Sequence, residues 1–142
     1  MKRADGRPGK AHVLRLEPGE DVRAVLSSWC TDNGIEAAAV ISAVGSLSTA
    51  HIRYGGRADG IVTSGDLEVC GLSGTLSRHG LHLHLAVADR DGAMHGGHLL
   101  TGSLVRTTLE IVVLEVDGVR MTRSKDAATG YDELDPRPLE ER

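Results

Sequence analysis

The chain has 142 residues, of which 40% are hydrophobic and 25% charged, a composition typical of one globular domain. Aromatic residues make up only 2%, so Val, Leu, Ile and Ala must build the core, and the base-stacking aromatics of single-strand nucleic-acid binders are missing. No apolar run approaches the roughly 20 residues of a membrane helix, and none follows the charged N-terminus as in a secretory signal.

We therefore expect a cytoplasmic protein in which Cys30 and Cys70 are reduced and buried. The net charge of −4 is unevenly distributed, because residues 1–10 carry four basic side chains against one acidic side chain. The body of the chain is acidic and repels DNA, so any attraction to DNA phosphates must come from this basic arm.

The first elements along the chain are a strand and a helix. Alternating residues predict a strand that begins at His12 and stops at Pro18-Gly19. Apolar residues at i, i+3, i+4 and i+7 then predict an amphipathic helix over residues 20–33, which ends at Asn33-Gly34. It is the only convincing helix in the pattern.

The rest of the chain predicts strands. The strand candidates cover 37–47, 49–54, 66–76, 81–88, 103–116 and 119–123, although the alanines leave a helix open for the first of them. The last two candidates predict a hairpin across Asp117-Gly118. The pattern as a whole predicts an α+β fold, with a mainly antiparallel sheet packed against one principal helix.

Four of the seven histidines lie between residues 82 and 98. Strand alternation in "LHLHLAVA" places His82 and His84 on one face and the leucines on the other. Two imidazoles at i and i+2 are close enough to bind one metal ion together. The alternative is a half-solvated sheet face that carries histidines without a ligand.

A third ligand depends on the register of the following hairpin. "DRDG" predicts a four-residue turn, which in a regular hairpin places His95 on the face of His82 and His84. A bulge at Gly96-Gly97 would slip the register by one residue and bring His98 to that face instead. We favour His98 as the third ligand, with His95 as the alternate. Three histidines with an open fourth position are typical of a catalytic zinc site, although a neighbouring subunit can fill that position.

The motifs "HVLRLEPGED", "AAVISAVGSLSTAHIRY", "LEVCGLSGTLS", "GLHLHLAVADRDG", "GGHLLTGSLVRTTLEIVV" and "ATGYDEL" resemble, in this order, the PPC domain (Plants and Prokaryotes Conserved), in its bacterial stand-alone form. The resemblance covers about residues 11–134, which implies a single domain between a flexible basic arm at 1–10 and a flexible acidic tail at 135–142. It also implies a homotrimer with a fold related to acetolactate decarboxylase and to a zinc-dependent ester hydrolase, both of which hold zinc with three histidines. The family motif carries over to His82, His84 and His98, whereas His95 stands where relatives more often have an apolar residue.

The resemblance also points to DNA. In plants the domain follows an AT-hook and mediates association with other proteins. The core of the AT-hook motif is Arg-Gly-Arg-Pro, but Asp5 replaces the first arginine in "DGRPGK", so the basic arm carries only an incomplete AT-hook. The leading hypothesis is therefore a homotrimeric, DNA-associated regulatory or protein-interaction role with a metal site.

The alternative hypothesis is a zinc-dependent lyase or hydrolase, acting on a small carboxylated or ester substrate. Zinc, or another divalent transition metal, at His82, His84 and His98 would polarise a carbonyl or activate a water. The candidate auxiliary groups are Glu110 as general acid or base, and Arg15, Arg53 or Arg106 for a substrate carboxylate. A third possibility is a metal that only fixes subunit packing. Whether the protein is an enzyme is left open by the sequence.

Overall fold

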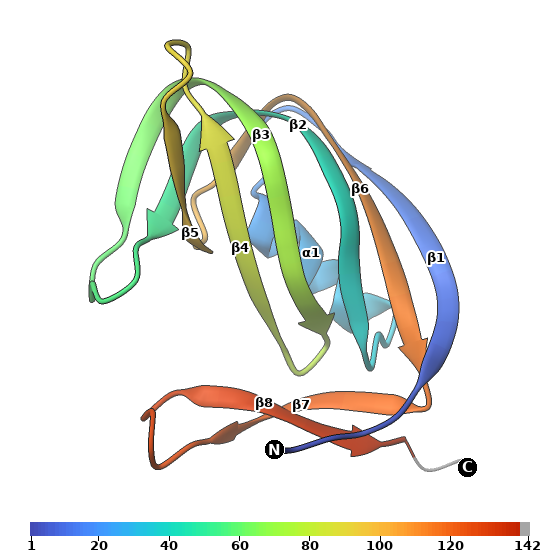
Figure 1. The fold of residues 1–142 in the computed structure, drawn as a ribbon. Coiled ribbons are helices and arrows are strands. Elements are labelled where there is room, and N and C mark those ends of the chain that lie inside the picture. The colour runs from blue at the N-terminus through green and yellow to red at the C-terminus, as the bar shows by residue number, and fades with distance from the viewer. Residues whose placement is uncertain (140–142) are drawn as a thin grey trace.

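A curved antiparallel sheet wraps around one short helix in the computed structural model, which describes residues 1–139 (Figure 1). The elements are β1 (Arg7–Leu16), α1 (Val22–Asp32), β2 (Ala38–Arg53), β3 (Ile61–Ser77), β4 (Gly80–Ala88), β5 (Met94–Leu99), β6 (Leu104–Asp117), β7 (Val119–Lys125) and β8 (Asp132–Pro138). The α+β fold class is therefore confirmed.

The large sheet has six strands in the order β1-β6-β2-β3-β4-β5. Its edge strand β5 also pairs with the end of β2, through Ile52 opposite Leu99 and Arg53 opposite His98. Because β5 pairs with both β4 and β2, the strands β2, β3, β4 and β5 form a closed arrangement. Residues of β2, β4 and β5 therefore lie together at the end of β2.

The helix is confirmed close to its predicted bounds. Asp21 is the N-cap, and its carboxylate accepts a hydrogen bond from the Ala24 amide at 3.0 Å. The buried face of the helix consists of Val22, Leu26 and Cys30, and burial raises the pKa of the Cys30 thiol to about 12. The expectation that both cysteines are buried is wrong for Cys70, which is exposed on β3.

Two expectations about the strands are also wrong. The candidates at 37–47 and 49–54 form one strand, β2, whose irregular register accommodates bulges. The hairpin across Asp117-Gly118 does not form, because β6 already pairs with β1 on one side and β2 on the other. The chain therefore leaves the large sheet after Asp117, and β7 pairs with β8 in a separate hairpin (Figure 1).

The terminal segments pack against this fold. Residues 7–10, within the segment expected as a basic arm, are the first part of β1, and the Lys2 ammonium lies 3.1 Å from the carboxylate of Asp135. At the other end β8 extends to Pro138, into the segment expected as a tail. Within residues 1–139, no helix is long and apolar enough to cross a membrane.

Candidate metal centre

Strand β4 separates apolar from imidazole side chains as its alternation predicts. Leu83 and Leu85 are buried in the core, on the face that packs against α1. His82 and His84 are exposed and therefore lie on the opposite face, which we call the outer face of the sheet.

The register of the β4–β5 hairpin places His98 directly opposite His84. The reason differs from the prediction, because the pairing runs from His84–His98 to Ala88–Met94 without a register shift at Gly96-Gly97. The turn has five residues, 89–93, instead of four. The Asp89 carboxylate holds it by accepting hydrogen bonds from the amides of Asp91 at 3.0 Å and Ala93 at 2.9 Å.

The three outer-face histidines converge on one point. Ring nitrogens of His82, His84 and His98 all lie within 4.8 Å of one another. The His84 Nε2 and His98 Nδ1 atoms are 3.2 Å apart and share a hydrogen bond. Two nitrogens bound to one tetrahedral zinc ion are separated by about 3.3 Å, so these two nitrogens already have the spacing of two ligands of one zinc ion. The donor set therefore fits a transition metal.

The surroundings of these histidines favour the neutral imidazole. Burial, followed by the charges of His84 and Arg123, lowers the pKa of His82. Burial, followed by the charge of Arg53, lowers the pKa of His98. Neutral imidazole is the form that binds metal, so the proton competes less with an ion here than at an ordinary histidine.

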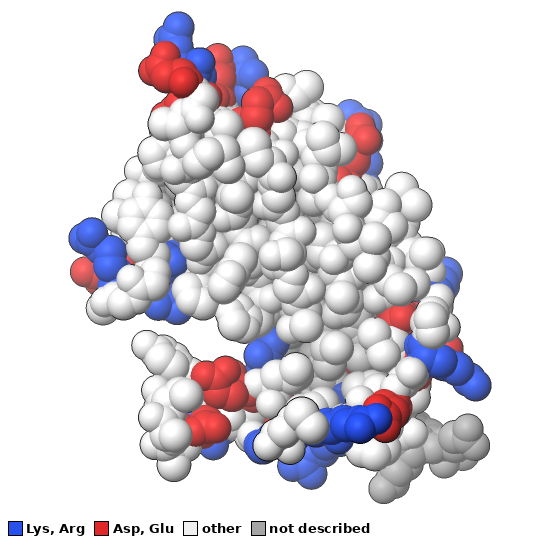
Figure 2. Space-filling model, viewed as in Figure 1, with Lys and Arg blue, Asp and Glu red and all other residues white. Residues whose placement is uncertain are grey.

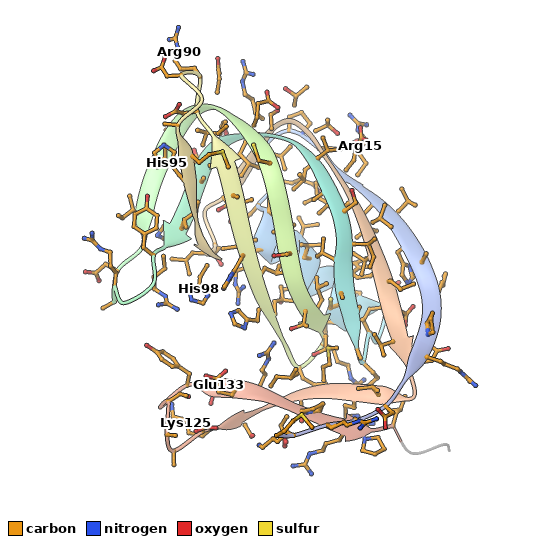
Figure 3. All side chains as sticks on the ribbon, in the orientation of Figure 1. Arg15, Arg90, His95, His98, Lys125 and Glu133 are labelled. Atoms are coloured by element: carbon orange, nitrogen blue, oxygen red, sulfur yellow. The ribbon has the colours of Figure 1, made fainter. Side chains whose placement is uncertain are left out.

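His95 lies apart from the three. It pairs with the buried Val87, so it shares the face of Val87 and not that of His84. Its Nε2 atom lies 3.1 Å from the Asp89 carboxylate, near the β4–β5 turn (Figure 3). The structure therefore assigns this imidazole to the turn, and the predicted alternate is not brought to the other histidines.

One of the four auxiliary candidates lies at the centre. Arg53 pairs with His98 across β2 and β5. Arg15 and Glu110 are instead cross-strand neighbours on β1 and β6, and Arg106 forms an ion pair with Asp66 at 3.0 Å. Figure 3 shows Arg15 far along the sheet from His98. The structure thus gathers Arg53 with the histidines and places the other three elsewhere.

A cavity of about 630 Å³ opens beside the histidines, between the end of the large sheet and the β7–β8 hairpin (Figure 2). His82, His98 and Arg53 line one side, and Arg123 and Glu133 line it from the hairpin. Figure 3 shows Glu133 on the hairpin, across this gap from His98.

Sequence reasoning missed two of the basic groups in this cavity, Arg123 on β7 and Arg23 on α1. Neither lies in a local motif with the histidines, and Arg123 reaches the site only because the hairpin folds beneath the sheet. The available signal was the "ATGYDEL" motif, whose Tyr131 and Glu133 also line the cavity.

Comparisons with known proteins identify similar folds and related sequences. A structure of a hypothetical protein from Salmonella enterica is similar with a TM-score of 0.91 and 38% identity, over 95% of this chain and 97% of that one. A metal-containing protein from Archaeoglobus fulgidus is similar with a TM-score of 0.81 and 30% identity, over 94% of this chain and 99% of that one.

Among curated sequences, a bifunctional protein GlmU from Synechococcus sp. (strain JA-3-3Ab) is 44% identical over 125 residues, which is 88% of this chain. The chain spans only about a fifth of the length of that relative. An AT-hook motif nuclear-localized protein 8 from Arabidopsis thaliana is 27% identical over 111 residues, or 72% of this chain and 28% of that protein. The model of the Plants and Prokaryotes Conserved domain, abbreviated PCC or PPC, matches residues 3–117, and the chain belongs to this family.

Proposed function

We propose that this PPC domain is a metal-binding protein that holds a zinc ion, or another divalent transition metal, through His82, His84 and His98. The observation that carries the proposal is the convergence of three imidazole donors within 4.8 Å on paired strands. The metal-containing protein from Archaeoglobus fulgidus, at 30% identity, supports the same reading.

A zinc ion held by His82, His84 and His98 would supply Lewis-acid chemistry toward a carbonyl or a water. The protein contributes the rigidity of the site. His82 and His84 are fixed by the alternation of β4, and His98 is fixed by its pairing with both His84 and Arg53. The binding of a ligand beside the metal is compatible with either a regulatory or an enzymatic role.

We also propose that the protein assembles as a homotrimer through the outer face of the sheet. The centre of this face carries few charged residues, which gather along its rim and on the hairpin (Figure 2). Val13, Ile41 and Val44 are large apolar residues that are more than half exposed, at 81%, 59% and 58%. Large apolar residues exposed on a face with few charges are typical of a subunit interface.

The metal is tested by measuring bound transition metals in the purified protein by mass spectrometry. We expect one ion per chain in the wild type, and none in the double variant His82→Ala/His84→Ala. His95→Ala is the matched control, because this imidazole belongs to the turn and its loss should leave the metal content unchanged. A wild-type protein without metal after incubation with zinc would contradict the proposal.

The assembly is tested by analytical ultracentrifugation. We expect the mass of three chains for the wild type and a smaller species for Val44→Glu, which places a charge in the apolar face. A monomeric wild type at micromolar concentration would refute the trimer.

A second candidate is a DNA-associated regulatory role, favoured by the relative that is named an AT-hook motif nuclear-localized protein. The basic residues of the first segment would supply the contact, although three of the four already have acidic partners: Lys2 with Asp135, Arg3 with Asp5, and Arg7 with Asp117. A gel-shift titration with A·T-rich duplex at moderate salt tests this role. No shift at micromolar protein would rule out binding strong enough to matter.

A further inference from the structure

We propose that the cavity beside the three histidines binds a small organic anion, whose oxyanion group is held by Arg53, Arg123 and Arg23. The inference deepens the proposed function, because it names the class of ligand that would approach the metal. The arginines themselves do not require the ion, so anion binding can be tested with and without it.

The first argument is that these arginines have no acidic partner. Arg53 donates to the carbonyl of Arg57 at 3.3 Å, and Arg123 donates to the Thr75 hydroxyl at 3.0 Å. Arg23 donates to two backbone carbonyls at 3.3 and 3.4 Å. No carboxylate within residues 1–139 lies within 4.0 Å of any of the three.

The pattern differs for most other arginines of the described chain. Seven of them lie within 4.0 Å of a carboxylate: Arg3, Arg7, Arg15, Arg78, Arg106, Arg120 and Arg137. Five described arginines have no carboxylate within 4.0 Å, and three of them, Arg23, Arg53 and Arg123, line the cavity, whereas Arg57, Arg90 and the paired arginines do not. Guanidinium groups with free donors that converge on one space match the geometry of a carboxylate or phosphate.

The second argument is electrostatic. Burial is the main cause that lowers the pKa of Arg123; the charge of Arg23 adds to this effect, and Glu133 opposes it. Arg23 and Arg123 therefore repel one another, and an anion between them would add to the compensation that Glu133 already supplies.

The third argument concerns the body of the ligand. The cavity has a volume of about 630 Å³, far more than an inorganic ion fills, and within the range of small-molecule sites. Leu81, Leu100 and Tyr131 give it an apolar part. Asp132 and Glu133 also line it, so the three arginines leave a net positive charge with these two carboxylates counted. A small organic acid fits this lining better than a polyanion.

The test uses three probes with one body, which are benzoate, phenyl phosphate and the neutral benzamide, in calorimetric titrations of the wild-type protein. We expect at least one anion to bind at least tenfold more tightly than benzamide. A preference for benzoate would identify a carboxylic acid, and a preference for phenyl phosphate would identify a phosphate ester. Equal binding of benzamide and both anions, or no binding of either anion, would overturn the proposal.

Variants identify the residues. We expect Arg53→Gln/Arg123→Gln to weaken anion binding at least tenfold, and each single variant to weaken it less. Arg106→Gln is the matched control, because Arg106 lies outside the cavity, and it should bind like the wild type. Thermal unfolding followed by circular dichroism identifies any variant that fails to fold, and the single variants then decide. Unchanged anion binding in folded variants would refute the role of the arginines.

The proposed metal centre and this inference can fail separately. Each titration is repeated on protein treated with a chelator, and the metal content of the arginine variants is measured beside it. Anion binding that depends on the arginines in a protein that never holds zinc would support the inference and refute the metal centre. Zinc bound through the histidines without arginine-dependent anion binding would do the reverse.

Discussion

Gly74 is the residue whose change most directly tests how the sheet positions the histidines. It pairs with Leu83 and has a φ of +136°, a conformation that residues with a Cβ rarely adopt. A Cβ at this position would lie 2.0 Å from the carbonyl oxygen of His82, whereas ordinary contacts begin at 3.4 Å. Gly74→Ala therefore forces β3 and β4 apart at the residue that carries the first proposed metal ligand.

The size of this effect follows from two costs. The unfavourable backbone conformation costs about 1–3 kcal/mol, and the displaced strand costs about 1–3 kcal/mol in overpacking. We expect the free energy of unfolding to fall by about 2–6 kcal/mol, which lowers Tm by on the order of 10 °C for a chain of this size. A metal site tolerates displacements of about 0.5 Å, so zinc affinity should fall at least tenfold.

The assay is calorimetric unfolding of the metal-free protein, with zinc affinity measured by competition with a chelating dye. Gly71→Ala on the same strand is the control, because a Cβ at Gly71 would meet nothing within 4 Å. It should change the free energy of unfolding by no more than about 0.5 kcal/mol. Equal Tm values and zinc affinities for the two variants would refute the link between the close approach of the strands and the site.

Three further changes test other contacts. Asp21→Ala removes the helix cap and should lower the free energy of unfolding by about 1–2 kcal/mol in urea titrations, so an unchanged midpoint would contradict the cap. Burial alone would raise the pKa of Glu36, but hydrogen bonds from His79 and Arg120 lower this pKa below 4.5. The ionised Glu36 therefore stabilises the folded protein above pH 4.5, and this stabilisation is lost as the pH falls through the pKa of Glu36 in the folded state. Glu36→Gln should therefore destabilise the protein at pH 7, and the difference from wild type should shrink in urea titrations at pH 3. The pKa values of His82 and His98 are lowered, so the loss of zinc affinity on acidification should begin at a more acidic pH than at a site of ordinary histidines, whereas a steep loss near pH 7 would contradict the shifts.

Local periodicity predicted the parts of the fold that depend on local physics. The helix of Val22 and Leu26, and the outward placement of His82 and His84, follow from spacing along one segment. The position of His98 beside the other two histidines was predicted, but from a bulge that does not form. The sequence does not reveal that the Asp89 carboxylate accepts a hydrogen bond from the Ala93 amide and so lengthens the turn.

Contacts between distant segments could not be predicted in this way. Asp117-Gly118 has the composition of a hairpin turn, but the sheet order leaves no free edge on β6 for β7. Arg123 therefore reaches the cavity through a separate hairpin that no local pattern indicates. The three histidines could be predicted because they lie on one hairpin, whereas the arginines that line the cavity come together only through the packing of separate elements.

The five-residue turn between β4 and β5 has a consequence for how the family can vary. Side chains alternate along β5, so a deletion or insertion that shifts the register of β5 against β4 by one residue exchanges the faces of every residue of β5. If the turn kept five residues, the loss of one residue would set Leu99 opposite His84, place His98 opposite the buried Leu85, and disturb the pairing with Arg53 as well. Asp89, whose carboxylate holds the turn, and the register that sets His98 opposite His84 are therefore both needed if the three histidines are to stay together.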